Sequence, residues 1–380
     1  MLSTQDREFL RIALELHEQT IIYEKIKVDY GYRFSKAFFT ILFLLKKISP
    51  DRKSVELKSN TAICFTQNQR NIISNLSKVN IIDFTFSLRD FVKFSNYQNL
   101  IAVFRFTREF PEYNKRYLKI LKAVVYSEAL CLGGEHSNHR ILLCNDHTVE
   151  AVYMRLKMQA VGIKVGYLQH ANVTGKFPKL AFDKVFLFSE RAKQTYLKKG
   201  PVRADIVVGT DLRHNNLKSS NKLKTNKVLI ILTKVDSIRV ATNLESKLKS
   251  LGYAVSISLH PADRRLLAKK LRFRSKSLLE NLAWADIVIA GRTTAIVEAA
   301  TVGLRVIYIG NYLLDKKFQT DKEFDLKATG FIKQEFYSNE IIAAVHEGRN
   351  SIDFNEIDYY VGDRKSKDDF LSNIQEWLVG

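Results

Sequence analysis

Short runs of β-branched and aromatic residues recur along most of this 380-residue chain, and longer stretches with helical spacing separate them. Runs that are apolar almost throughout are typical of strands buried on both faces, as in a parallel sheet. Strand, helix and strand in succession form the crossover unit of an α/β domain. We therefore expect an α/β protein with parallel sheets. The expected strands lie within 61–67, 80–86, 140–146, 164–170, 184–190, 204–210, 227–233, 253–260, 285–291 and 305–310.

Helices are expected between and around these strands. The first 60 residues have mainly helical spacing, and a final helix is expected at 368–378. The remaining expected helices lie at about 149–161, 238–250, 262–271, 277–283 and 293–302.

The length of the chain favours two domains, since about 150 residues is a common domain size. The segment 217–226 (LKSSNKLKTN) is polar and basic, with two leucines as its only large apolar residues, and we predict that it is the linker. Residues 1–216 would form an N-terminal domain with a helical extension, and residues 227–380 a C-terminal domain. Packing of the last helix back on the N-terminal domain is the alternative left open.

The charge of the chain is strongly unbalanced. Sixty Lys and Arg residues against 40 Asp and Glu residues leave a net charge of +20, which predicts an anionic partner or an anionic membrane surface. The longest apolar run, residues 37–45, is far shorter than the roughly 20 residues of a spanning helix. The segment 35–48 is either a helix packed on the core or a basic helix resting on a membrane. We expect a cytoplasmic protein, either soluble or peripheral on the inner face of the cytoplasmic membrane.

The three cysteines, Cys64, Cys131 and Cys144, have no CxxC spacing and predict reduced thiols rather than a zinc or disulfide framework. The chain contains no GxGxxG, GxxxxGK[ST], HExxH or GxSxG motif, and its carboxylates show no metal-ligand spacing. It also contains no zinc knuckle, aromatic RNP pattern or helix-turn-helix. These absences disfavour a nicotinamide-dependent oxidoreductase, a P-loop enzyme, a metal site and a nucleic-acid partner. A non-catalytic basic protein that binds nucleic acid or membrane is the rival hypothesis.

Candidate anion-binding residues follow the predicted strands of the second half. In an open parallel sheet, ligands bind beyond the carboxyl ends of the strands. A helix that begins there presents free N–H groups and the positive end of its dipole to a phosphate. Glu298, about one turn into that helix, is placed to reach ribose hydroxyls, although a plain N-capped helix gives the same pattern. The predicted nucleotide-binding residues are Thr233, Lys234, His260, Pro261, Gly291, Arg292, Thr293, Thr294 and Glu298.

The first half places a second set of polar residues after two successive strands. Asp146 and His170 are candidates for the general base that removes a proton from an acceptor hydroxyl. For either residue alone, a structural hydrogen bond is the simpler interpretation. The residues expected to contact the acceptor are His147, Gln169, Asn172 and Lys176.

Three segments carry a family resemblance. QHANVTGKFPKLAFDKVFLFSE, then SLHP, then ENLAWADIVIAGRTTAIVEAATVGLRVIYIG resemble GT-B glycosyltransferases of bacterial capsule and lipopolysaccharide assembly. They are similar to sialyltransferase-like and Kdo-transferase-like enzymes that use CMP-sugars, and also to CDP-glycerol-dependent glycerophosphotransferases. The resemblance covers roughly residues 140–310. It implies two Rossmann-like domains that face each other across a cleft and need no bound metal.

The resemblance also implies roles for particular residues. His260 with Pro261, and Thr293 with Thr294, would hold the nucleotide phosphate, and His260 would also act in catalysis. The base would be Asp146 by likeness to the sialyltransferases, or His170 by likeness to the glycerophosphotransferases, whose His-Gly pair is His-Ala here. A Thr-Thr pair likewise replaces the more usual Ser-Ser or Ser-Thr.

The expected reaction moves a 3-deoxy-ulosonate, such as sialic acid or Kdo, from a CMP-sugar to an anionic glycan or a lipid-linked acceptor. The nucleotide-sugar is a co-substrate, and no other cofactor is expected. A CDP-polyol phosphotransferase and a UDP-sugar glycosyltransferase of the same fold are the alternatives.

Overall fold

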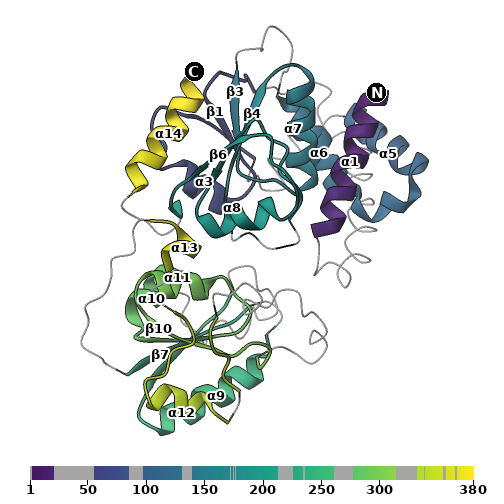
Figure 1. Cartoon of the computed structure of the whole chain (residues 1–380). Coiled ribbons are helices and arrows are strands. Elements are labelled where there is room, and N and C mark those ends of the chain that lie inside the picture. Colours follow the sequence, from purple (N-terminus) through teal and green to yellow (C-terminus); the bar gives the residue numbers. More distant parts are fainter. Residues whose placement is uncertain are drawn as a thin grey trace. The chain divides into compact units, whose positions relative to one another are not determined.

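The computed structural model describes most of the chain, which folds into two compact units (Figure 1). The first unit comprises Met1–Arg213 and Asp363–Gly380, and the second comprises His214–Gly362. The predicted linker lies outside the described residues except for Asn226, as do the expected helices at 35–48 and 262–271. The described residues are 2–20, 55–84, 97–130, 139–171, 173, 175, 177–212, 226–233, 236–260, 277–313, 332–337, 339–353, 357–363 and 366–380.

The first unit contains a six-stranded sheet whose neighbouring strands are all parallel, in the order β2-β1-β3-β4-β5-β6. Each of the first six runs singled out in the sequence contains one of these strands. The strand order reverses between β1 and β3, which makes the carboxyl ends of these two strands the topological switch point. The strands are β1 (Thr61–Cys64), β2 (Asn80–Asp83), β3 (Arg140–Leu143), β4 (Lys164–Leu168), β5 (Lys184–Leu187) and β6 (Asp205–Val208).

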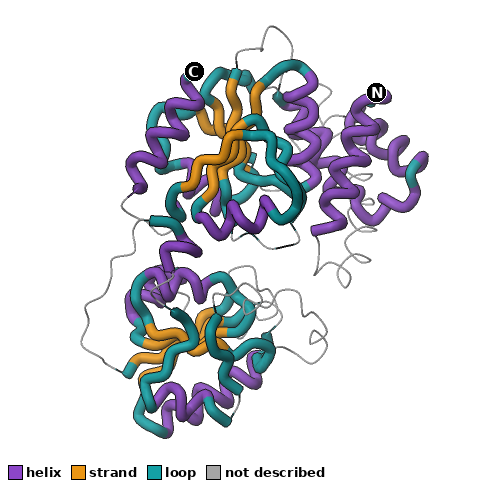
Figure 2. Tube along the Cα trace, viewed as in Figure 1, coloured by secondary structure: helices purple, strands orange, loops and turns teal. Residues whose placement is uncertain are grey.

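Alternate residues of these strands face opposite sides of the sheet, and helices cover both sides (Figures 1 and 2). On β3, Ile141 and Leu143 belong to one core and Leu142 to the other. The first core includes residues of α1 (Thr4–Thr20), α5 (Tyr97–Glu109), α6 (Tyr117–Ala129), α7 (Val149–Ala160) and α8 (Glu190–Leu197). The second includes residues of α3 (Gln67–Ile73) and α14 (Lys367–Val379). A short 3-10 helix (Pro111–Arg116) connects α5 to α6.

The C-terminal helix α14 packs on the first sheet although the whole of the second unit precedes it in the chain. Two glycines make this close packing possible. A Cβ atom at Gly209 would lie 2.0 Å from the Phe370 ring, and one at Gly166 would lie 2.7 Å from the Trp377 ring. Arg140 Nη1 also donates to the carbonyl oxygen of Trp377 at 2.8 Å. The helix is therefore part of the core of the first unit.

The second unit repeats the same plan with four parallel strands in the order β10-β9-β7-β8. Each of the four remaining runs contains one strand, and the switch point lies between β7 and β9. The strands are β7 (Lys227–Ile231), β8 (Ala254–Ser258), β9 (Ile287–Ala290) and β10 (Arg305–Tyr308). Residues of α10 (Leu278–Trp284), α11 (Ala295–Thr301) and α13 (Ile357–Val361) join the core on one face, and those of α9 (Ile238–Ser250) and α12 (Ile341–His346) join it on the other.

Each unit is thus a parallel sheet with helices on both faces. The predicted α/β fold with two Rossmann-like units is confirmed. None of the described helices combines the length and apolar character that crossing a bilayer requires.

Replacing Phe370 tests how strongly α14 holds the first unit. We expect Phe370→Ala to lower the free energy of unfolding by about 3–5 kcal/mol, because it leaves a cavity above Gly209. Val379→Ala, at a position 74% exposed on the same helix, should change it by less than about 0.5 kcal/mol. Urea denaturation followed by Trp377 fluorescence, in a Trp284→Phe background, measures both. Equal effects of the two variants would show that α14 does not stabilise this unit.

Candidate functional site

The turn after β3 is held by a side chain that the sequence did not single out. Asn145 Oδ1 accepts hydrogen bonds from the backbone N–H groups of His147 at 3.0 Å and Thr148 at 2.8 Å. The Asn145 carboxamide thus closes the turn that leads into α7, while the hydroxyl of Thr148, the N-cap residue, makes no capping bond. This turn fixes the direction in which Asp146 and His147 leave the sheet edge.

Asp146 is enclosed by partners on both of its carboxylate oxygens. Oδ1 lies 2.7 Å from His147 Nδ1, and Oδ2 accepts the hydroxyl of Tyr196 at 2.5 Å. The Tyr196 hydroxyl lies 3.3 Å from that of Tyr167 on β4. Burial, with the charge of Asp146, raises the pKa of both tyrosines well above the ordinary value, so both remain donors. The Asp146 side chain has no exposed surface.

These contacts give His147 a defined tautomer. An ionised carboxylate can only accept a hydrogen bond, so the proton of the neutral imidazole lies on Nδ1 and the lone pair on Nε2. The His147 side chain is 20% exposed. The centroid of its ring lies 5.9 Å from that of the His170 ring, on which it stacks, and 4.7 Å from that of the Phe177 ring. The His147 carbonyl accepts from His17 Nδ1 at 3.0 Å, and Lys119 in turn contacts His17 Nε2. Asp146 therefore orients His147, whose outer nitrogen has the lone pair that a base requires.

The structure places the other predicted residues of this edge as follows. His170 lies beside His147, with its Nε2 3.5 Å from Asn145 Nδ2. Gln169 is buried, and both polar atoms of its side chain bond to the backbone. Its Oε1 accepts from the Phe188 N–H at 2.8 Å, and its Nε2 donates to the Ala171 carbonyl at 2.8 Å. Asn172 and Lys176 lie outside the described residues. Asp146, His147 and His170 thus form one cluster.

A hollow of about 230 Å³ opens beside this cluster, at the carboxyl ends of β1 and β2 and the start of α7. The prediction from sequence missed all of its residues, although Glu150 follows Asp146 by one helical turn and that spacing was visible. The hollow is lined by Phe65, Thr66, Gln67, Phe84, Lys122, Tyr126 and Glu150.

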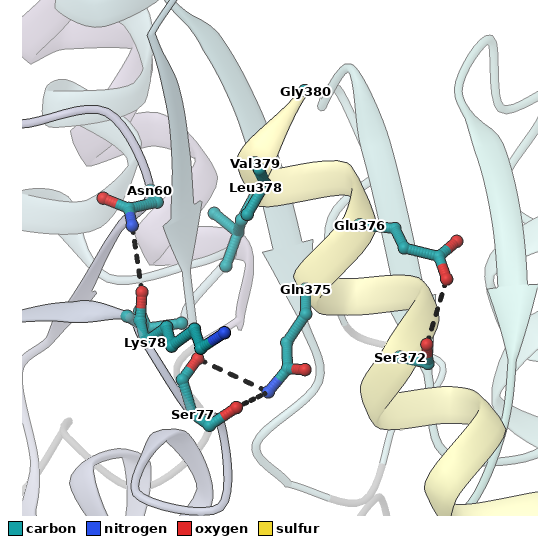
Figure 3. A pocket seen from close by; sticks show the side chains of 10 residues that line it. Asn60, Ser77, Lys78, Ser372, Gln375, Glu376, Leu378, Val379 and Gly380 are labelled. Carbon is teal, nitrogen blue, oxygen red and sulfur yellow. Dashed lines mark hydrogen bonds between the residues drawn. The ribbon is translucent and has the colours of Figure 1, made fainter.

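A larger hollow of about 410 Å³ lies at the opposite, amino edge of the same sheet (Figure 3). Asn60 and Lys78 line it just before β1 and β2 begin, and the last turns of α14 close it. Gln375 Nε2 donates to Ser77 Oγ at 2.7 Å across this junction. Ligands of parallel sheets bind at the carboxyl edge, so we interpret this hollow as a seam between α14 and the sheet.

The turn after β9 in the second unit is tight. A Cβ atom at Gly291 would lie 2.7 Å from the Gly310 carbonyl oxygen, so only glycine is accommodated there. Thr293 donates its N–H to the Gly291 carbonyl at 2.8 Å, and its hydroxyl accepts from Ala295 N–H at 3.3 Å, at the start of α11. The hydroxyl of Thr293 is thus used in capping, whereas Thr294 is exposed and makes no side-chain capping bond.

Arg292 in this turn is unusual for a charged residue. It is only 8% exposed, yet its Nε and Nη1 have no hydrogen-bond partner in the part of the chain that the structure describes. A buried charge without a counter-charge is costly, by several kcal/mol for an ion left alone. The guanidinium lies at the switch point of this sheet, where ligands of open α/β sheets bind.

Two further predicted residues lie at the carboxyl ends of the neighbouring strands. Thr233 follows β7 and donates its N–H to Asp236 Oδ2 at 2.5 Å, and His260 follows β8 and is exposed. Because β9, β7 and β8 are adjacent in the sheet, Arg292, Thr233 and His260 share one edge. Glu298 is partly buried on α11. Lys234 and Pro261 lie outside the described residues.

Other reactive groups are unsuited to a direct chemical role. Cys64 and Cys144 are free and buried, and burial raises the pKa of the Cys64 thiol to about 12, so it stays protonated. Cys131 lies outside the described residues. Across the described ranges, no three His, Cys, Asp or Glu side chains gather where they could hold a metal ion.

Comparison with known proteins adds little to this geometry. No known protein family matches the chain, and no curated protein is similar to it. Among solved structures, the chain is similar to a Listeria monocytogenes protein to which UDP-N-acetylglucosamine 2-epimerase activity has been ascribed. The identity is 12%, the TM-score is 0.44, and the match covers 84% of this chain and 94% of that one. This likeness is too slight to carry an argument about either fold or activity. The fold and site themselves define an α/β protein of two Rossmann-like units, with polar clusters at both switch points.

Removing the Tyr196 hydroxyl tests the network around Asp146. We expect Tyr196→Phe to lower the free energy of unfolding by about 1–3 kcal/mol, because a buried carboxylate oxygen loses its donor. Tyr359→Phe, at a position 43% exposed, is the matched control and should have little effect. Urea denaturation measures both variants. If they were equally stable, the bond between Tyr196 and Asp146 would not contribute to the fold.

Proposed function

We propose that this protein is a glycosyltransferase that binds a nucleotide-activated sugar at the carboxyl edge of its second sheet. The observation that carries the proposal is Arg292, a buried guanidinium at the switch point whose Nε and Nη1 have no partner among the described residues. A phosphate would supply both a negative charge and acceptor oxygens arranged for the planar guanidinium fork.

The neighbouring groups suit the rest of such a ligand. Thr294 is exposed and lies two residues after Arg292, and His260 follows β8, which is two positions from β9 in the sheet. Both offer donors to further phosphate oxygens. Glu298 on α11 is proposed to accept from ribose hydroxyls. The roles of His260 and Thr294 agree with those that the GT-B resemblance implied for these positions.

We propose His147 as the general base, with Asp146 as the residue that positions it. The acceptor hydroxyl gives its proton to His147 Nε2 as its oxygen bonds to the anomeric carbon of the donor sugar. The bond from that carbon to the phosphate oxygen breaks, and its electron pair leaves with the nucleotide. Asp146 stabilises the imidazolium that forms, while Arg292 and His260 stabilise the departing phosphate. His170, stacked near His147, is the rival base.

This reaction requires the two switch points to face each other across a cleft, as in GT-B enzymes, and that arrangement is part of the proposal. On the motif resemblance, a CMP-linked 3-deoxy-ulosonate is the first choice of donor, with a CDP-polyol or UDP-sugar as the alternative. The net charge of +20 supports an anionic glycan or lipid-linked acceptor and contact with the inner leaflet.

Nucleotide binding is the first test. In a thermal-shift panel of CMP, CDP, UMP and UDP, we expect one base to be preferred, with about 2.7 kcal/mol of stabilisation at 100 times its Kd. Arg292→Met should abolish this response without destabilising the ligand-free protein, because it removes a buried charge whose Nε and Nη1 have no partner among the described residues. Arg239→Met, at an exposed site in the same unit, is the control. Equal, salt-sensitive responses to any polyanion would instead favour the non-catalytic basic protein.

Turnover distinguishes the candidate bases. With the CMP-sugar or other donor that the panel selects, we expect His147→Gln to lower kcat for nucleotide release by about 10²–10⁴-fold. Asp146→Asn should also lower kcat and alter the pH profile, because the amide can hold the opposite imidazole tautomer. His170→Gln should have a smaller effect, and nucleotide-induced stabilisation should persist in all three variants. Loss of activity with His170→Gln but not with His147→Gln would assign the base to His170.

A further inference from the structure

The hollow beside His147 has the position expected of a ligand site. Its residues Phe65, Thr66 and Gln67 follow β1, and Glu150 begins the helix that follows β3. These are the two strands between which the strand order of the first sheet reverses. In open α/β sheets, ligands bind in the crevice at that point.

One wall of the hollow is aromatic. The Phe84 ring stacks on Tyr126 at a centroid distance of 4.5 Å and an interplanar angle of 11°. Phe65 lies 6.1 Å from Phe84 and 6.2 Å from Tyr126. The three rings come from two strand ends and from α6. Phe84 and Tyr126 are only 2% and 3% exposed, so Phe65 is the ring that is partly accessible from the hollow, and the rest of the accessible lining is mainly polar.

Two residues of the hollow, Lys122 and Glu150, carry side chains of opposite charge that do not pair with each other. Lys122 on α6 attracts the Glu150 carboxylate, but the two form no ion pair, and no described acid or base pairs with either. Burial raises the pKa of Glu150, while the charges of Lys122 and Lys119 act in the opposite direction. The hollow therefore holds an acceptor and a donor of opposite charge, and these two charges sum to zero.

We propose that this hollow is a saccharide subsite that binds a single sugar ring. Adjacent hydroxyls of a ring can donate to Glu150 and accept from Lys122, while C–H groups of the ring contact the partly exposed Phe65. The volume of about 230 Å³ lies below the roughly 300–1,000 Å³ of pockets for drug-sized ligands, so it suits one ring rather than an oligosaccharide. The inference rests on the proposed function only in assigning this ring to the acceptor, beside His147.

Direct binding of simple glycosides to the full-length protein tests the subsite. The probes are methyl β-D-galactopyranoside, methyl α-D-glucopyranoside and methyl α-D-mannopyranoside, titrated by saturation-transfer NMR. γ-Aminobutyrate serves as a zwitterionic comparison, since an ammonium and a carboxylate also match Lys122 and Glu150. We expect at least one glycoside to bind, and Glu150→Gln and Lys122→Met each to weaken it about tenfold or more, because each removes a charge-assisted hydrogen bond.

Exposed residues of the same unit provide matched controls, Glu112→Gln and Lys199→Met, which should bind as the parent protein does. Circular dichroism and thermal melting show that each variant is folded. Failure of all three glycosides to bind, equal binding by the subsite and control variants, or binding of γ-aminobutyrate alone would each overturn the proposal.

Nucleotide-dependent stabilisation, measured on the same samples, separates this inference from the proposed function. A normal nucleotide response without glycoside binding removes only the subsite. Glycoside binding that depends on Glu150 and Lys122, with no response to any nucleotide, supports the subsite and removes the glycosyltransferase proposal.

Discussion

Helices cover both faces of each parallel sheet, and this burial determines where polar chemistry is located in the protein. Strands that are apolar on both sides leave no room for a charged side chain along their length. Polar groups therefore gather where the strands end, and the widest opening at that edge is the switch point. Both units place unusual polar residues there: Asp146, His147 and Glu150 near the β1–β3 switch point, and Arg292 at the β7–β9 switch point.

The strands were the most predictable part of the fold. Ten runs of apolar residues predicted ten strands, because burial on both faces leaves a local signal that needs no knowledge of distant residues. Helices with clear spacing, such as α7 and α9, were predicted to within a residue of their bounds. The helices between β1 and β3, and also α8, α12 and α13, were not singled out.

The packing of α14 on the first sheet shows where prediction from sequence stops. The only trace of this packing in the sequence is the pair Gly166 and Gly209. These two glycines matter because the Trp377 and Phe370 rings approach them closely. Neither glycine reveals its partner locally, since the second unit lies between each glycine and its partner in the chain. The hydrogen bonds of Asp146 could not be predicted from local sequence either, because the second donor, Tyr196, lies 50 residues away on another helix. Sequence spacing identified Asp146 and His147 as neighbours at a sheet edge, but only the fold shows that one orients the other.

Asp146 and Arg292 illustrate two opposite states of a buried charge. Asp146 has a donor on each oxygen, and both donors come from the chain itself, so its environment is complete before any ligand arrives. Arg292 is nearly as buried, but two of its nitrogens have no acceptor among the described residues. The fold thus offsets the cost of burying Asp146, whereas in the proposed function a bound phosphate would offset the cost of burying Arg292. The proposed transfer would use both states: a base that the fold orients in advance at one switch point, and a cation that stabilises the anionic leaving group at the other.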